Sequence, residues 1–416
     1  MLIQKPKGTL DILPKEAEQR RHILEKIRKT LSNYNYSEIQ TPTFENTSLF
    51  KRSIGEETDV VSKEMYSFND DEYTLRPEMT APVVRAYLEN SMYNESPVQK
   101  LFYFSNMYRH ERPQAGRYRE FSQYGIEVIG SGDFTVDVEV IAVGLQILND
   151  FGIRDIKTKI NNIGTQQERA LFIDDLKKYL TKYLQVLSID SRKRFEKNPL
   201  RILDSKDPSD IEVLENAPVL YEYLSKETKD FFSNVLDMLK DLRIKFEVDY
   251  RLVRGFDYYT STTFEVISDE LGSQNAIFGG GRYDMLVEQL GGKPTPAIGF
   301  ACGIERLMIV LDKNEYQYPE KEQLKLFIVS IGEDAKKFAL KTAIALRKKN
   351  FKCETDMLNR SVKSQMKEAN RLNAEYAIVI GNEELESNEA KLKRMSDGIE
   401  IDVSVDKIYE LNYNID

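Results

Sequence analysis

The sequence predicts a large α+β domain built on a mainly antiparallel sheet flanked by helices, with a helical insertion and a C-terminal α/β domain. Three observations predict this fold class. Residues 101–130 alternate with period two on either side of a loop, which is typical of a strand, a turn and a return strand. Residues 165–240 instead carry a heavily charged helical pattern. Beyond residue 324, strand-like and helix-like segments alternate, as they do in α/β units.

The other elements of the first part follow in chain order. An amphipathic pattern over about Glu16 to Ser32 predicts a helix, and Pro42 in the next stretch suits a strand or a turn. Strand-like alternation returns at about residue 245, and the glycine cluster FGGGRYD follows it. The stretch PAIGFACGIERL is predicted to run from a strand into a helix after Gly303.

Length and composition bound the class of protein. At 416 residues the chain is too long for one ordinary core, and we expect parts at 1–324 and 325–416, the first interrupted at about 165–240. No run approaches about 18 consecutive apolar residues and the start lacks an apolar export segment, so we expect a cytoplasmic protein without a membrane partner. The 2 cysteines and 2 histidines predict neither a disulfide framework nor a protein-held metal site.

Positive charge is concentrated in one stretch of an acidic chain. The formal net charge is -9, yet residues 107–124 read MYRHERPQAGRYREFSQY. Because strand side chains alternate, Phe121, Gln123 and Glu127 share one face, and that face is not apolar as a core face would be. Arginine offers a planar charged fork to phosphate or carboxylate oxygens, and an aromatic ring can stack on a base. The hairpin alone fits a nucleotide site and a solvated hairpin with cross-strand ion pairs equally well.

Four further stretches are ambiguous when taken singly. In LRPEMT, Glu78 is a charge favoured near a helix start and Thr80 is a candidate cap for that helix. In LVRGFDYYT, Arg254 precedes a tyrosine pair of a kind often half-buried in strands. Glycines such as those of FGGGRYD permit close backbone approach to a ligand. In GIERL, Arg306 falls in the first turn of a helix, where free N–H groups favour an anion.

Together these stretches resemble the histidyl-tRNA synthetase family of class II aminoacyl-tRNA synthetases. YRHERPQAGRYREFSQYGIEVIG is similar to the family's motif 2, PAIGFACGIERL to its motif 3, and TPTFENTSLFKRSIGEETDVVSKEMYSF to its motif 1 region. LVRGFDYYT and GGGRYD resemble its two histidine-specific signatures, and LRPEMT resembles its substrate loop. The segment from residue 325, with NRSVKSQMKEANRLNAEYAIVIG, is similar to its anticodon-binding domain.

The resemblance implies a histidine–tRNA ligase. Such an enzyme activates L-histidine with ATP to histidyl-adenylate and pyrophosphate, then transfers histidine to the 3′ end of its tRNA. The resemblance also implies Mg²⁺ with the ATP, and a homodimer built through the motif 1 region. Arg254 and Arg109 are the implied catalytic residues, with Arg254 stabilising charge at the α-phosphate.

Binding roles are implied residue by residue. Histidine is expected to contact Glu78, Thr80, Arg109, Gln123, Glu127, Arg254, Tyr258 and Tyr259. ATP is expected to contact Arg109, Glu111, Arg117, Phe121 and Arg306. The tRNA acceptor end is expected to meet Arg112, Gln114 and Arg119.

Met79 is a departure from the family pattern, since it stands where this loop commonly has glycine. It slightly favours a rival class, the catalytically silent relatives that serve as regulatory subunits of ATP phosphoribosyltransferase. Those relatives typically have degraded histidine signatures and no anticodon domain. This sequence has both the signature stretches and a segment similar to the anticodon-binding domain. A class II synthetase for another amino acid, such as threonine or proline, is a further alternative, against which Glu127 and the tyrosine pair speak.

Overall fold

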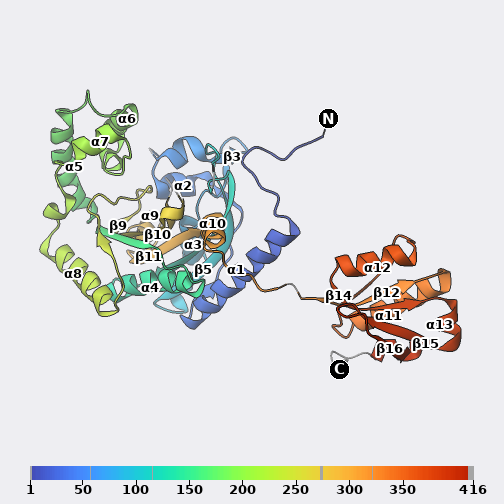
Figure 1. The fold of residues 1–416 in the computed structure, drawn as a ribbon. Coiled ribbons are helices and arrows are strands. Elements are labelled where there is room, and N and C mark those ends of the chain that lie inside the picture. The colour runs from blue at the N-terminus through green and yellow to red at the C-terminus, as the bar shows by residue number, and fades with distance from the viewer. Residues whose placement is uncertain (1, 57, 115, 272–274, 321, 411–416) are drawn as a thin grey trace. The chain divides into compact units, whose positions relative to one another are not determined.

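The computed structural model describes residues 2–56, 58–114, 116–271, 275–320 and 322–410, and they form two compact units (Figure 1). The first unit is Met1–Tyr318 and the second is Pro319–Asp416. Ala115 in the loop of the predicted hairpin and Lys321 in the stretch before residue 325 lie outside the described residues. Within the described ranges, no helix has the length and apolar character needed to cross a membrane.

An eight-stranded sheet forms the centre of the first unit. Its strands, in spatial order, are β1 (Ser37–Glu38), β5 (Gln99–Tyr108), β6 (Glu120–Ile129), β11 (Ala297–Gly303), β10 (Ala276–Arg282), β9 (Thr260–Ile267), β7 (Lys157–Asn162) and β8 (Glu247–Val248). The pairings from β5 through to β7 are antiparallel, and only the short edge strands β1 and β8 pair in parallel. This confirms the predicted mainly antiparallel sheet.

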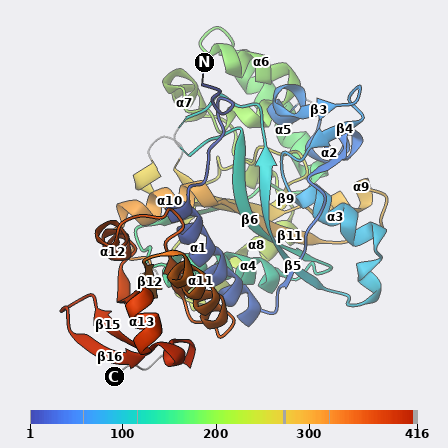
Figure 2. The ribbon, with the colours of Figure 1, turned by 90° about the vertical axis from the view of Figure 1, so that its right-hand side faces the viewer.

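Helices cover one face of this sheet and bury its main core. They are α1 (Pro14–Asn33), α4 (Phe134–Asp150), α8 (Lys226–Asp241) and α10 (Ile304–Lys313). Tyr124, Ile126 and Val128 of β6 belong to this core, so alternate residues of β6 must face the other way. The long hairpin of β5 and β6, visible in Figure 2, therefore presents Phe121, Gln123 and Glu127 on the opposite face.

Smaller elements lie around that opposite face. They are α2 (Thr47–Ile54), α3 (Thr80–Glu89), α9 (Leu286–Gln289), the three-stranded sheet of β2 (Phe44–Asn46), β4 (Tyr73–Leu75) and β3 (Tyr66–Phe68), and the short turns Val60–Glu64 and Met92–Asn94. The short turn Asp269–Leu271 instead lies on the helix-covered side, where Leu271 packs against the main core. Between β7 and β8 the chain forms α5 (Gln166–Thr181), α6 (Ile189–Lys197), α7 (Pro208–Leu214), α8, and the short turns Pro199–Ile202 and Leu220–Tyr223. Phe232, Val235 and Leu239 of α8 join the main core, so α8 supports the sheet directly.

The second unit is a five-stranded sheet with helices. Its strand order is β13 (Cys353–Thr355), β12 (Leu324–Ser330), β14 (Ala374–Ile380), β15 (Glu389–Arg394) and β16 (Glu400–Ser404). Its helices are α11 (Glu333–Arg347), α12 (Val362–Arg371), α13 (Asn382–Ser387) and the short turn Val405–Glu410. Strands β13, β12 and β14 are parallel, as expected for strands joined by helices, and confirm the predicted α/β domain.

Candidate active site

A cavity of about 400 Å³ lies on the face of β6 that points away from the main core, here called its open face. Its wall comes from the loop before α3, the β5–β6 hairpin, the loop before β9 and the first turn of α10. The predicted histidine and ATP residues in this wall are Glu78, Thr80, Arg109, Glu111, Arg117, Phe121, Gln123, Arg254, Tyr258, Tyr259 and Arg306. The remaining one, Glu127, hydrogen-bonds to two residues of the wall. The structure thus brings these predicted residues together.

Glu127 is the buried carboxyl at the deep end of the cavity, with 1% of its surface exposed. Its oxygens accept hydrogen bonds from Thr80 Oγ1 at 2.8 Å and from the Tyr283 hydroxyl at 2.5 Å. Burial raises the pKa of Glu127 to about 8 even though both hydrogen bonds favour the carboxylate. Gly299 on the adjacent strand makes room for it, because a Cβ there would lie 1.9 Å from Glu127 Oε2.

Glu78 caps the helix that forms one side of the cavity. Its carboxylate accepts the backbone N–H groups of Thr80 at 2.7 Å and Ala81 at 2.9 Å. These amides have no partner within α3, and such a cap contributes about 1 kcal/mol. Burial raises the pKa of Glu78, against the effects of these hydrogen bonds and of Arg109. The suggestion that Thr80 caps this helix is wrong, because α3 begins at Thr80 itself and its hydroxyl donates to Glu127.

Met79 is a buried part of the same wall. Its side chain is 1% exposed, and its sulfur accepts a hydrogen bond from Thr41 Oγ1 at 3.5 Å. Its φ of -118° is open to any residue, so this backbone does not require the glycine common in the family.

Three tyrosines close the deep end. The Tyr258 and Tyr259 rings lie 4.7 Å apart, and Tyr283 lies 5.8 Å from Tyr258. All three are buried, which raises the pKa of each hydroxyl and keeps it protonated. Tyr283 lies in the GGGRYD stretch, but nothing in that stretch marked it as a partner of Glu127.

Arg254 lies between this deep end and the mouth of the cavity, which is formed by Arg109, Arg117 and Arg306. Its Nη1 donates to Glu265 Oε1 at 2.9 Å, and its guanidinium lies 5.7 Å from the centre of the Tyr259 ring. Burial opposes its charge, but Tyr259 and Glu265 outweigh burial and raise the pKa of Arg254. Gly279 leaves space for it, since a Cβ there would lie 2.6 Å from Arg254 Nη1.

Arginines crowd the mouth of the cavity. Arg109 Nε donates to the Pro77 carbonyl at 2.8 Å, and its guanidinium lies 5.3 Å from the centre of the Phe121 ring. Arg117 forms an ion pair with the buried Glu111. Arg306 Nη1 donates to the Ala276 carbonyl at 3.0 Å, and burial together with the neighbouring Arg117 lowers the pKa of Arg306. Arg109 and Arg117 share the single carboxylate of Glu111, and an excess of positive charge of this kind attracts a polyanion.

Glu305 was not predicted from the sequence, and its carboxylate joins the β5–β6 hairpin to α10 at the mouth of the cavity. Glu305 is buried, accepts the Ser122 N–H at 3.1 Å and forms an ion pair with Arg20 at 2.8 Å. Ser122 lies between two residues of the cavity wall on β6, and Glu305 immediately precedes Arg306. The carboxylate thus connects the hairpin to α10 just beyond the point where β11 stops pairing with β6.

The predicted acceptor-end residues lie outside the cavity wall. Arg112 and Gln114 are exposed on the hairpin loop. Arg119 is half-buried, and its Nε donates to the Glu111 carbonyl at 3.2 Å.

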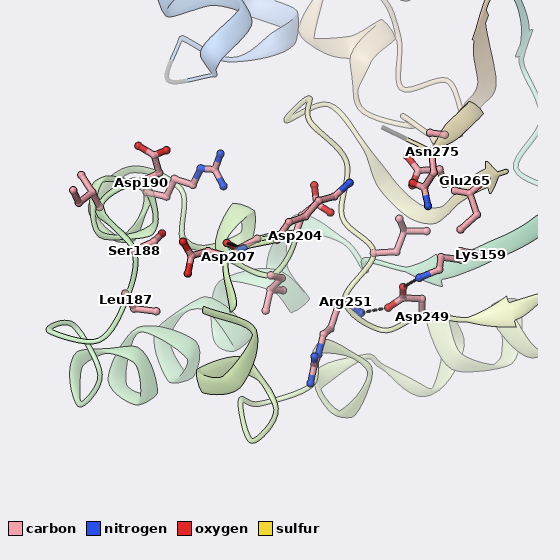
Figure 3. A pocket seen from close by; sticks show the side chains of 18 of the residues that line it. Lys159, Leu187, Ser188, Asp190, Asp204, Asp207, Asp249, Arg251, Glu265 and Asn275 are labelled. Atoms are coloured by element: carbon pink, nitrogen blue, oxygen red, sulfur yellow. Dashed lines mark hydrogen bonds and ion pairs between the residues drawn. The ribbon is translucent and has the colours of Figure 1, made fainter. Parts of the chain in front are cut away.

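A larger groove of about 1350 Å³ adjoins the mouth (Figure 3). One side of it comes from the segment around α6 and α7, with Ser188, Asp190, Asp204 and Asp207, and the other from Lys159, Asp249, Arg251, Glu265 and Asn275. Arg117, Glu265 and Arg306 line both the groove and the cavity, so the two are continuous. An extended molecule lying in the groove would reach the cavity mouth.

An antiparallel sheet that carries an arginine hairpin beside a buried small-ligand pocket is the architecture of class II aminoacyl-tRNA synthetases. A family model described as histidyl-tRNA synthetase matches residues 8–307, and one described as an anticodon binding domain matches residues 325–411. The chain belongs to the histidyl-tRNA synthetase family.

Full-length relatives agree with this assignment. The chain is 46% identical to the histidine–tRNA ligase of Halothermothrix orenii over 99% of both chains, and 46% identical to that of Clostridium perfringens over 98% of both. The crystal structure of apo histidyl-tRNA synthetase from S. aureus is similar, with a TM-score of 0.81 and 37% identity over 98% of this chain and 99% of that chain.

Proposed function

We propose that this protein is a histidine–tRNA ligase. It joins the carboxylate of L-histidine to the α-phosphate of ATP, releases pyrophosphate, and then transfers the histidyl group to the 3′ end of its tRNA with release of AMP. The observation that carries the proposal is one cavity with a buried Glu127 at its deep end and arginines at its mouth. Membership of the histidyl-tRNA synthetase family supports it.

The deep end suits an imidazole. Imidazole offers a donor and an acceptor at fixed separation, and a buried carboxyl with a pKa of about 8 can serve either nitrogen near neutral pH. We assign the imidazole to Glu127 and Tyr259, with Tyr258 beside them. We assign the binding of the histidine amino and carboxylate groups to Glu78, Thr80 and Gln123. A ligand without both ring nitrogens leaves buried groups unpaired there, which gives the site its selectivity.

The mouth suits the triphosphate of ATP. We assign the α-phosphate to Arg109 and Arg254, and the β- and γ-phosphates to Arg117 and Arg306. Phe121 stacks on adenine and Glu111 accepts from its amino group, both at the expense of their present contacts with arginines. Electrostatic stabilisation and positioning suffice for this displacement, because it needs no covalent enzyme intermediate.

Mg²⁺ enters in this proposal as part of the substrate, bound to the phosphates of ATP. In the described parts of the chain, no three His, Cys, Asp or Glu side chains are grouped so as to hold a metal ion. Two carboxylates of the cavity wall, Glu111 and Glu265, are each paired with an arginine.

Two regions serve the tRNA in this proposal. The match of residues 325–411 to an anticodon-binding domain supports a role for the second unit at the anticodon. The exposed hairpin loop and Arg119 are assigned to the acceptor end, together with Arg112 and Gln114. The groove of Figure 3 is continuous with the cavity, so a strand bound in the groove would reach the mouth.

We propose a homodimer that acts in the cytoplasm. An aromatic cluster on the three-stranded sheet supports the dimer, because Phe44 is 49% exposed and Phe68 is 43% exposed while the two rings lie 5.8 Å apart. Large exposed aromatic side chains are typical of interfaces. Sedimentation checks the dimer, and a fully active species of 48.3 kDa would contradict it.

Aminoacylation of unfractionated tRNA with labelled histidine tests the function. We expect labelled histidine to be attached to tRNA only when both ATP and this protein are present. The amount attached should reach a plateau set by the amount of histidine-accepting tRNA. Failure to charge tRNA, with a correctly folded protein and active tRNA, would contradict the proposal.

A further inference from the structure

The loop that carries Arg254, Tyr258 and Tyr259 lacks secondary structure of its own. Residues 253–259, here called the signature loop, form neither helix nor strand before β9 begins at Thr260. Three side chains of the cavity depend on it, so something outside the loop must fix its backbone. A displacement of about 1 Å in such a site can cost a hundredfold in rate.

The segment between α6 and α7 is hydrogen-bonded to the start of the signature loop. Arg201 Nη2 donates to the Gly255 carbonyl at 2.8 Å, directly after Arg254. The same guanidinium forms an ion pair with Asp59 at 3.4 Å, which orients its planar fork from the other side. Arg201 lies in the cavity wall, but no ligand contact is predicted for it.

The same segment also holds the middle of the loop. Asn198 Nδ2 donates to Asp257 Oδ1 at 3.1 Å, while the Asp257 N–H donates to the Ile54 carbonyl at 3.1 Å. Asp257 is therefore fixed between the segment after α6 on one side and the end of α2 on the other.

Helix α5 holds the end of the loop. Arg169 Nη1 donates to the Tyr259 carbonyl at 2.9 Å. Burial lowers the pKa of Arg169, although the charge of Asp257 opposes that shift. A partly buried guanidinium that donates to a backbone carbonyl fixes the position of that peptide group strongly.

We propose that the helical insertion positions the histidine site, with Arg201, Asn198 and Arg169 as positioning residues that act through the backbone of the signature loop. The proposal rests on the function proposed above and adds a role for the insertion that does not involve tRNA. Arg201 sets the place from which Arg254 extends, and Arg169 sets the place from which Tyr259 extends. Loss of either contact frees groups assigned to histidine and to the α-phosphate, and leaves the adenine side of the mouth unchanged.

Histidine- and ATP-dependent pyrophosphate exchange, measured on the full chain without tRNA, tests the proposal. The variants are Arg201→Ala, Arg201→Lys and Arg169→Met, and Arg192→Ala is the matched control because Arg192 is an exposed arginine on α6. We expect Arg201→Ala and Arg169→Met to lower kcat/KM for histidine about tenfold or more, with the KM for ATP near the wild-type value. Arg201→Lys should recover part of the loss because lysine can donate one hydrogen bond to Gly255.

Three results would decide against the proposal. One is wild-type exchange kinetics in Arg201→Ala and Arg169→Met, with only tRNA charging impaired, since the insertion would then serve tRNA alone. Another is a parallel loss of histidine and ATP parameters with a lowered melting temperature, which would mean a general fold defect. The third is an equal loss in Arg192→Ala. Absence of histidine-dependent exchange in the wild-type protein would instead contradict the proposed function.

Discussion

The deep end and the mouth of the cavity are built in opposite ways. At the deep end Glu127, Tyr258 and Tyr283 are each at most 2% exposed, and Glu127 already has two hydrogen-bond partners. At the mouth, the Arg117 side chain is 38% exposed, and burial together with the nearby arginines lowers the pKa of Arg306. The groups at the deep end are satisfied by the protein itself, whereas the mouth carries more positive charge than its one carboxylate, Glu111, balances.

This difference teaches how one cavity can treat two ligands differently. A preformed buried end selects a small ligand by the hydrogen bonds that a wrong ligand leaves unmade. An exposed end with excess positive charge attracts a large anion, and added salt weakens that attraction. Changes at the deep end should therefore alter discrimination and rate, while changes at the mouth should alter mainly ATP affinity.

The boundary between the two ends is tested by Arg254→Ala. We expect the adenylation rate to fall about a hundredfold or more with the KM for histidine nearly unchanged, because the residue stabilises charge at the α-phosphate. Single-turnover pyrophosphate release measures the effect, with Arg251→Ala as a control since Arg251 donates to the Leu214 carbonyl and lies outside the cavity wall. A rise in KM for histidine alone would place Arg254 wholly at the deep end.

Removal of the second unit tests whether both ends belong to the first unit alone. A chain that stops at residue 318 retains every residue of the cavity wall. We expect it to keep histidine-dependent pyrophosphate exchange, and its charging of tRNA to fall steeply at ordinary tRNA concentrations. Full charging would show that the second unit does not serve the tRNA, and loss of exchange would show that the two units work as one.

Glu127→Gln tests the preformed character of the deep end. We expect kcat/KM for histidine to fall about tenfold, because the amide keeps the shape but cannot accept from Thr80, Tyr283 and an imidazole alike. The KM for ATP should stay close to the wild-type value. If catalytic efficiency fell equally with respect to histidine and to ATP, the distinction between the two ends would be contradicted.

The same variant carries a prediction about stability and pH. Folding raises the pKa of Glu127 from 4.5 to about 8, so its contribution to stability is fully present below the unfolded value and is lost as pH rises through about 8. The wild-type protein should therefore lose more melting temperature than Glu127→Gln between about pH 5 and about pH 8. Parallel melting curves for the two proteins would show that Glu127 titrates normally.

Glu305→Gln gives the smallest expected effect and probes the mouth. The amide still meets Ser122 but loses the charge that pairs with Arg20. We expect the KM for ATP to rise about fivefold, or about 1 kcal/mol, which is part of the roughly 1.5–3 kcal/mol that a hydrogen bond to a charged group contributes, with the KM for histidine unchanged. A change confined to histidine would mean that Glu305 supports the deep end.

Local patterns in the sequence predicted much of this arrangement. The alternation of β6 separates Tyr124 and Ile126 in the core from Gln123 and Glu127 on the open face, as its period requires. The strand before Gly303 and the helix after it also have local signals, and the structure confirms both. The hairpin of β15 and β16 was not predicted, because its short strands bury few apolar residues.

Contacts distant in sequence could not be predicted from local patterns. Tyr283 donates to Glu127 across 156 positions, and Glu305 accepts from Ser122 across 183. The cap on α3 was assigned to Thr80 because threonine is a common cap, whereas the side chain of Glu78 reaches the free amides. The gathering of the predicted site residues came from the family resemblance, and the roles of these residues remain predictions.

The central claim is that the buried end selects histidine while the arginine-rich end holds ATP. Pyrophosphate exchange measured with each of the standard amino acids in turn tests it most directly. The account predicts exchange with histidine and none above background with threonine, proline or the other amino acids. Faster exchange with any other amino acid, or no exchange with histidine, would contradict it.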